Sequence, residues 1–191
     1  MTTKYNYLYN GNNLLNQGKA EINENVFDNY WEILPIEKTQ ITEDKINLKL
    51  KKEQSASLFV QSEKKAVLAI QKHAMNIAGK EKNPQMDEAY FLLGESRYYD
   101  QRFIPSLEAF NYILFKYPTS ELVNNATIWR EKINAKDNYN QLDIENLKEI
   151  ESRGRLSNEE IVDLNAVLAQ AYLNSKKFDS AGIRLETDTE K

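Results

Sequence analysis

The sequence predicts an all-α fold, built as an α-solenoid of stacked helical hairpins. Three observations predict it. Only 6 of the 191 residues are Gly and only 4 are Pro, which leaves too few turn signals for a fold made of many short strands. Apolar residues recur at three- and four-residue spacing along most of the chain, as on one face of a helix. A pattern of about 34 residues also recurs, and repeats of this length are typical of solenoids.

The first 37 residues predict a pair of helices. Each helix is expected to carry its own apolar group: Tyr7, Leu8, Leu14 and Leu15 in the first, and Ile22, Val26, Phe27, Tyr30, Trp31 and Ile33 in the second, which ends before Pro35. In residues 38–54 apolar and polar residues briefly alternate, at Ile46, Leu48 and Leu50. A short strand there would lack a partner, so we expect an extended linker that lies across the helices.

Residues 55–86 are expected to hold a long helix and a connector. Ser55 or Ser57 is placed to cap the start of the helix, and Gly79 is placed to end it. Pro84 forbids an uninterrupted helix beyond that point, so residues 80–85 are a connector. We expect the long helix to pack beside the helix that follows.

Residues 87–120 give the clearest repeat. Two helices are predicted, over 87–99 and 105–115, with Pro105 in the first turn of the second. Small residues at positions 8 and 20, counted from Asp87, let the two helices approach closely, and bulky residues fill the remaining space. The residues that resemble the tetratricopeptide repeat (TPR) signature are Tyr90, Leu93, Gly94, Ser106, Phe110 and Pro118.

Two weaker matches to the same frame flank this repeat. One starts at Val162 and runs through Leu168, Ala169, Tyr172, Phe178 and Ala181; a degenerate one starts at Lys4 and uses Tyr7, Gly11 and Pro35. The chain is therefore expected to divide into 1–37 (TPR-like pair), 38–54 (linker), 55–86 (long helix), 87–120 (TPR), 121–161 (TPR-like pair with an insertion) and 162–191 (truncated TPR).

Between the two better repeats the sequence predicts further helices. Thr119 or Ser120 is expected to cap a helix that runs through Ile133. A weaker helix over 142–150 is ended by Gly154. Ser157 and Glu160 have the spacing of a capping box, so a helix over 160–173 follows, and then a last helix after Phe178.

Composition argues against several kinds of chemistry. The chain has no Cys, which excludes thiol catalysis and disulfides, and a single His, which excludes a multi-histidine metal site. The net charge of −4 comes with no basic block, so nucleic acid is not an expected partner. His73 is expected to be structural, and Glu88 and Glu95 are expected to belong to a solvated helix face. We expect no enzymatic activity, cofactor or metal.

The dense aromatic cluster around residues 90–117 suggests where a partner would bind. Phe91, Tyr98 and Tyr99 fall at positions 5, 12 and 13 of the frame, which normally line the concave groove of a TPR array. Arg97 is expected to pair with Asp100 or Glu95, or to reach an acidic group of a partner. The candidate partner-binding residues are Phe91, Glu95, Arg97, Tyr98 and Tyr99. Packing in the core or between repeats is the alternative role for the aromatic residues.

Two stretches carry a more specific resemblance. The run TTKYNYLYNGNNLLNQGKAEINENVFDNYWEILPIE, with EKKAVLAIQKHAMNIAGKEKN ahead of the repeat, resembles the N-terminal region of the SprE/PorW-type lipoproteins. These lipoproteins belong to the gliding-motility and type IX secretion machinery of Bacteroidetes. The ending FKYPTS of the second repeat helix is also similar to TPR repeats of bacterial envelope lipoproteins. The resemblance covers most of residues 2–181.

The resemblance implies a non-enzymatic periplasmic scaffold that binds other proteins of the secretion and gliding apparatus. It also implies an outer-membrane tether through a lipid-modified Cys upstream, and therefore that this chain is a fragment. The first residues lack the charged and apolar regions of a signal peptide, so the protein is expected to be cytosolic or to have lost an export signal. Two alternatives remain: a general envelope TPR adaptor in outer-membrane protein assembly or cell-wall organisation, and a carboxylate-based cell-wall hydrolase.

Overall fold

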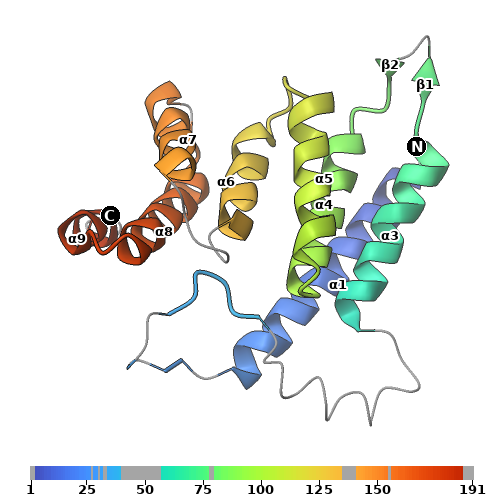
Figure 1. Ribbon diagram of the computed structural model, residues 1–191. Coiled ribbons are helices and arrows are strands. Elements are labelled where there is room, and N and C mark those ends of the chain that lie inside the picture. The colour runs from blue at the N-terminus through green and yellow to red at the C-terminus, as the bar shows by residue number, and fades with distance from the viewer. Residues whose placement is uncertain are drawn as a thin grey trace. The chain divides into compact units, whose positions relative to one another are not determined.

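The computed structural model describes residues 3–26, 28–29, 31, 34–39, 57–77, 80–134, 141–154 and 156–186. Within these residues the fold is helical apart from one very short hairpin of strands, which confirms the predicted all-α class (Figure 1). The helices are α1 (Thr3–Asn25), α3 (Leu58–His73), α4 (Met86–Tyr99), α5 (Phe103–Lys116), α6 (Val123–Asn134), α7 (Gln141–Arg153), α8 (Asn158–Asn174) and α9 (Phe178–Glu186). The strands are β1 (Asn76–Ile77) and β2 (Lys80–Glu81), which pair antiparallel. The chain forms two compact units, Met1–Ile113 and Leu114–Lys191.

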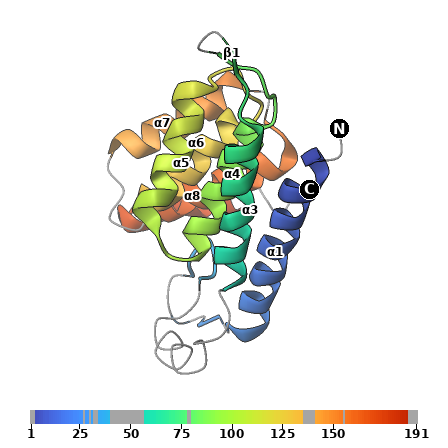
Figure 2. The ribbon, with the colours of Figure 1, turned by 90° about the vertical axis from the view of Figure 1, so that its right-hand side faces the viewer.

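The first unit is a row of antiparallel helices. Figures 1 and 2 show that α1, α3, α4 and α5 alternate in direction along the chain. Helix α3 packs against both α1 and α4, and α1 also contacts α4. The predicted packing of the long helix beside the helix of residues 87–99 is thereby confirmed.

Helices α1 and α3 approach closely at two glycines of α1. A Cβ on Gly18 would lie 2.7 Å from ring carbons of Phe59, so only glycine leaves room for that fully buried ring. Closer to the start of α1, the Ser62 hydroxyl donates to the backbone oxygen of Gly11 over 2.8 Å. The Ser96 hydroxyl of α4 donates in turn to Ser62 over 2.8 Å. This buried chain of hydroxyls links α4 and α3 to the backbone of α1.

The hairpin of α4 and α5 repeats the same contact. The Ser106 hydroxyl of α5 donates to the backbone oxygen of Gly94 over 2.7 Å, and both residues are buried. A Cβ on Gly94 would lie 2.7 Å from the nearest carbon of the Phe110 ring. In both helix pairs a glycine on one helix therefore receives a serine hydroxyl from the other.

The second unit contains the last four helices. Helix α6 contacts α7 and α8, α7 contacts α8, and α8 forms a hairpin with α9. The predicted capping box is confirmed, because the Ser157 hydroxyl accepts from Glu160 N while the Glu160 carboxylate accepts from Ser157 N. Gly154, with φ +67°, follows the end of α7 as predicted.

The hairpin turns of the two units have the same hydrogen-bond pattern. At the end of α4, Gln101 N donates to Tyr98 O and Arg102 N donates to Arg97 O. At the end of α8, Lys176 N donates to Leu173 O and Lys177 N donates to Tyr172 O. Gln101 and Lys176 both have left-handed backbones, with φ 60° and 58°. Both turns are thus Schellman motifs, in which one left-handed residue reverses the chain after a helix.

The predicted helix pair within residues 1–37 is wrong in one respect. Ile22, assigned to the second helix, belongs to α1, which runs without a break to Asn25. Gly18 lies inside this helix, and its missing side chain makes the space that Phe59 fills. Of the residues expected in the second helix, Val26 and Trp31 lie outside any helix, whereas Phe27, Tyr30 and Ile33 are outside the described residues.

The predicted ends of the long helix and of α6 also need correction. Ser57 caps α3 by accepting from Val60 N, but the helix ends at His73 and the chain continues into β1 and β2, so Gly79 does not stop it. Ser120 accepts from Leu122 N in the turn before α6 and does not cap that helix, which begins at Val123. Most of the predicted 38–54 linker is outside the described residues.

Candidate partner-binding site

All five predicted partner-binding residues lie on α4. Acidic Asp87 and Glu88 in its first turn and Arg97 in its last turn match the helix dipole. A run of small and apolar residues buries the helix among its neighbours. The side chains of the site point in different directions, and between them they contact α1, α3, α5 and the segment of Glu37.

Tyr98 and Tyr99 are buried side chains. They are 2% and 4% exposed, so neither lines an open surface, and the expectation that both face an open groove needs correction. The Tyr99 ring stacks on Phe59 of α3, with ring centres 5.5 Å apart. The Tyr98 ring meets Tyr99 and Phe103 edge-on, each at 5.5 Å. The space left by Gly18 for Phe59 thus also sets the position of Tyr99.

Polar groups from two distant segments gather around Tyr99. Its hydroxyl donates to Glu37 Oε2 over 2.6 Å, a short bond to a charged acceptor. Lys19 Nζ of α1 lies 4.8 Å from the centre of the Tyr99 ring and 2.9 Å from Glu95 Oε1. Glu95 is therefore held by α1, and Tyr99 is covered by the segment that follows α1.

Burial raises the pKa of both tyrosines far above the usual range. For Tyr99 the negative charge of Glu37, its hydrogen bond, and the charge of Glu95 add to the effect of burial. For Tyr98 burial is the larger cause and the charge of Glu37 the second. The protonated Tyr99 phenol donates its hydrogen bond to the Glu37 carboxylate.

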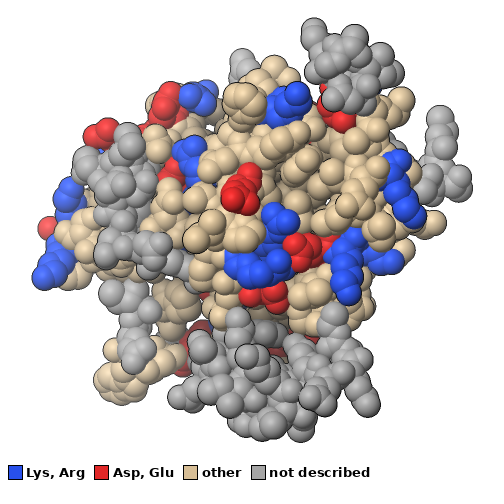
Figure 3. Space-filling model, turned by 45° about the vertical axis from the view of Figure 1, so that its right-hand side comes forward, with Lys and Arg blue, Asp and Glu red and all other residues tan. Residues whose placement is uncertain are grey.

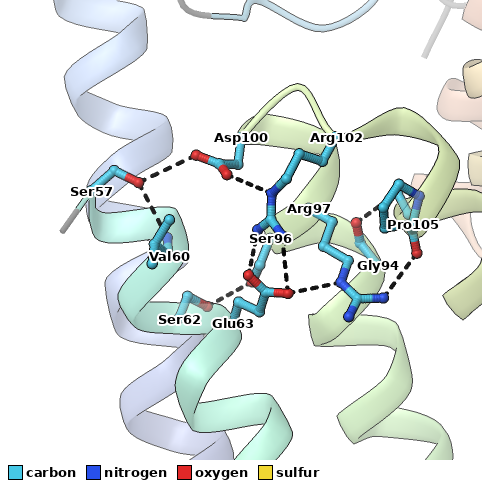
Figure 4. A network of polar contacts seen from close by, with 11 residues as sticks. Ser57, Val60, Ser62, Glu63, Gly94, Ser96, Arg97, Asp100, Arg102 and Pro105 are labelled. Carbon is cyan, nitrogen blue, oxygen red and sulfur yellow. Dashed lines mark hydrogen bonds and ion pairs between the residues drawn. The ribbon is translucent and has the colours of Figure 1, made fainter. Parts of the chain in front are cut away.

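Arg97 pairs with neither of the residues predicted for it. Its Nε donates to Glu63 Oε1 of α3 over 2.8 Å, and its guanidinium also donates to Pro105 O over 3.0 Å (Figure 4). Arg102 donates to both carboxylate oxygens of Glu63 and, over 2.7 Å, to Asp100 Oδ2. The Ser57 cap of α3 reaches Asp100 as well. This network joins α3 to α4 and to the start of α5.

The pKa of Glu63 reflects two opposing effects. Burial alone would raise the pKa, but hydrogen bonds from Arg102 and Arg97, with their charges, outweigh burial and hold it below the usual range. Glu63 therefore stays ionised and serves as the shared anion of both guanidinium groups. Its role is to hold Arg97 against α3, so that the Arg97 guanidinium binds groups of its own chain.

Phe91 is half-buried and meets the Phe110 ring edge-on at 5.5 Å. The preceding residue, Tyr90, stacks on Tyr112 of α5, with ring centres 4.2 Å apart. Burial and the hydrogen bond to Tyr112 raise the pKa of Tyr90 to about 12. These aromatic contacts hold α4 and α5 together, the alternative role that the sequence left open.

Sequence reasoning missed Lys19, Glu37 and Glu63. Each comes from a segment far away in the chain, and no local spacing pairs it with α4. His73 lies at the end of α3, where its Nε2 is buried without a hydrogen-bond partner in the described structure. Glu88 is exposed and accepts from Gln85. In the ranges that the structure describes, no group of three or more acidic or histidine side chains is arranged to hold a metal ion.

The charge distribution gives no strong field on the face shown in Figure 3, where acidic and basic groups are interspersed. Among the described helices, none combines the length and apolarity needed to cross a bilayer. No family model and no curated protein matches the chain.

Proposed function

We propose that the chain is a non-enzymatic scaffold of TPR-like hairpins that binds protein partners. The observation that carries the proposal is the pair of matching hairpin turns. Gln101 and Lys176 both fall at position 15 when counted from Asp87 and Val162, and both turns use the same hydrogen bonds. A sequence frame and a backbone geometry that recur together are what stacked repeats require.

Small residues at the frame positions support the same reading. Gly94 meets Ser106 at positions 8 and 20 of the α4–α5 hairpin. Ala169 and Ala181 hold these positions in the α8–α9 hairpin, where they are 2% and 1% exposed. Gly11, at position 8 of the frame that starts at Lys4, receives the hydroxyl of Ser62 in the same way.

The N-terminal repeat is therefore a split repeat in this proposal. Its first helix is α1 and its second is α3, and residues 26–57 are an insertion between them. Ser62 takes the place that Ser106 has in the next hairpin. The predicted end of this repeat at Pro35 then falls inside the insertion, which explains why its frame is degenerate.

The carboxylates of Glu63 and Glu95 form ion pairs with cationic side chains, which favours a binding protein over a hydrolase. A carboxylate-based hydrolase needs one acidic and one basic carboxyl group facing each other across a cleft. Glu95 instead pairs with Lys19, and Glu63 with Arg97 and Arg102. The resemblance to SprE/PorW-type lipoproteins supports a periplasmic scaffold of the gliding and type IX secretion apparatus, tethered to the outer membrane in a longer protein.

Crosslinking and capture from an envelope extract of a gliding Bacteroidetes bacterium tests the proposal. We expect secretion and gliding components to be recovered with the chain and not with an unrelated helical protein of similar charge. Recovery of only outer-membrane assembly or cell-wall proteins would favour the general adaptor. Cleavage of cell-wall glycan that is lost in Glu88→Gln or Glu95→Gln would overturn the non-enzymatic reading.

A further inference from the structure

The segment 34–39 is anchored to the first unit at two consecutive residues. The Glu37 carboxylate accepts from the Tyr99 hydroxyl of α4 over 2.6 Å. Lys38 Nζ lies 3.0 Å from Asp28 Oδ1 and donates to Val26 O over 3.3 Å. The segment itself has no helical or strand structure. Two neighbouring side chains therefore hold this segment, Glu37 on α4 and Lys38 on the residues that follow α1.

The place where Glu37 docks belongs to the site predicted for partners. Tyr98, Tyr99 and Glu95 are three of the five residues of α4 that the sequence predicted to bind a partner. Glu37 is close enough to Tyr98 and Tyr99 for its charge to raise the pKa of both. An internal segment thus covers the residues that a partner would contact.

The chemistry of the docking place is that of a carboxylate acceptor. The Tyr99 hydroxyl donates a hydrogen bond, and the ammonium of Lys19 stands over the same ring. Glu95 already forms an ion pair with Lys19, at 2.9 Å, and its negative charge repels a second carboxylate near Tyr99. A carboxylate on Tyr99 therefore gains the hydrogen bond of the phenol but also meets the negative charge of Glu95.

We propose that residues 34–39 are an internal pseudo-ligand, and that a partner protein binds α4 by placing the carboxylate of a non-helical, Glu-containing segment on Tyr99 in place of Glu37. This inference rests on the proposed function, whose binding surface it specifies. The internal segment competes at an effective concentration of roughly millimolar, because it is tethered to the same chain. A partner must therefore outcompete Glu37 or bind after the segment is released.

A peptide copy of the segment tests the exchange. The probe is a fluorescein-labelled, end-capped peptide of residues 34–39, Leu-Pro-Ile-Glu-Lys-Thr, followed by fluorescence anisotropy against the full chain. Binding to Glu37→Ala is expected to be about tenfold or more tighter than to the wild type, because the internal competitor is lost. A peptide with Gln in place of its Glu is the matched control and is expected to lose the gain.

A second variant separates binding from folding. Glu37→Ala combined with Tyr99→Phe retains the buried ring and removes only the hydroxyl, so the gain in peptide affinity is expected to vanish while the melting temperature changes little. The inference is overturned if Glu37→Ala keeps the wild-type melting temperature but binds the peptide no better than the wild type. It is also overturned if Tyr99→Phe leaves the gain intact.

The outcome is independent of the envelope capture. If the peptide exchanges but no component is captured, the pseudo-ligand inference is supported and the proposed role in the secretion apparatus is contradicted. If components are captured equally well by wild type and Glu37→Ala, and the peptide does not exchange, the scaffold proposal is supported and the pseudo-ligand inference is contradicted.

Discussion

The α4–α5 hairpin and the α8–α9 hairpin share a turn but differ in how their helices touch. Both turns place a non-glycine residue in the left-handed conformation and use the same two reverse hydrogen bonds. In the first hairpin a glycine carbonyl accepts a serine hydroxyl at the close approach. In the second, buried Ala169 and Ala181 hold the corresponding positions. The turn geometry is thus the common part, and the contact between helices varies.

The difference shows which positions tolerate a change of side chain. Close contact through glycine leaves no space for one more carbon, whereas Gly182 of α9 has open space around it. The first hairpin is also fixed from outside, because Glu63 of α3 holds Arg97 and Arg102 at its turn. The second hairpin has a counterpart of another kind, in which Arg184 of α9 pairs with Glu151 of α7. We therefore expect the first hairpin to be the less tolerant of the two.

The largest effect is expected for Gly94→Ala. The new methyl would lie 2.7–3.0 Å from three carbons of the fully buried Phe110 ring, which cannot move aside without disturbing the core. Overpacking of this kind costs about 2 kcal/mol of the free energy of unfolding. Urea denaturation followed by circular dichroism measures the loss. In a double-mutant cycle, Phe110→Leu is expected to relieve part of it; strict additivity would mean that the two residues do not compete for space.

Glu63→Gln is expected to have the next largest effect. It removes the anion shared by Arg97 and Arg102, and we expect a loss of about 1 kcal/mol near neutral pH, because both guanidinium groups remain partly hydrated. The pKa of Glu63 is lowered in the folded protein, so its contribution is complete above the ordinary value of 4.5 and is lost as the pH falls through the folded-state pKa.

The pH profile of Glu63→Gln is the diagnostic measurement. Melting temperatures of wild type and variant are expected to differ at pH 7 and to converge as the pH falls below 4.5 and through the folded-state pKa of Glu63. A difference that persists unchanged into acid would mean that the carboxylate charge is not what holds Arg97. Glu149→Gln, which removes an exposed partner of Arg153 within α7, is the matched control and is expected to change little.

Local sequence signals predicted most of the helices but not their partners. The capping box at Ser157 and the break at Gly154 are decided by residues a few positions apart, and both are found where expected. Sequence reasoning assigned Gly18 no role, because its contact with Phe59 becomes visible only when the two helices pack together. That contact depends on two segments meeting in space, which no local pattern encodes.

The same distinction applies to the candidate site. The repeat frame placed the five residues on one helix, and in the structure all five lie on α4. The burial of Tyr98 and Tyr99, however, depends on α3 and on the segment of Glu37. Arg97 had acidic residues near it in sequence and still pairs with Glu63. A helix brings together side chains three or four positions apart, yet a guanidinium at its edge is equally free to reach the next helix.

The shared turn gives a third prediction, with the same expected effect in both units. Gln101→Gly and Lys176→Gly each remove a side chain from a left-handed residue, and each is expected to gain about 1 kcal/mol of stability. Urea denaturation of both single variants and of the double variant measures the gains, which are expected to add. A gain in only one hairpin would show that the two turns are alike in geometry but not in strain.

The smallest effect is expected at Gly182, which has room for a side chain where Gly94 has none. Its position inside α9 costs helix stability, and a methyl group added there would meet no atom within 4 Å. Gly182→Ala is therefore expected to gain about 0.5 kcal/mol, opposite in sign to Gly94→Ala. Amide hydrogen exchange in α9 is the sensitive measurement, since this short helix opens locally before the unit unfolds. Slower exchange in α9 supports the comparison, whereas faster exchange would mean that the second hairpin is packed as tightly as the first.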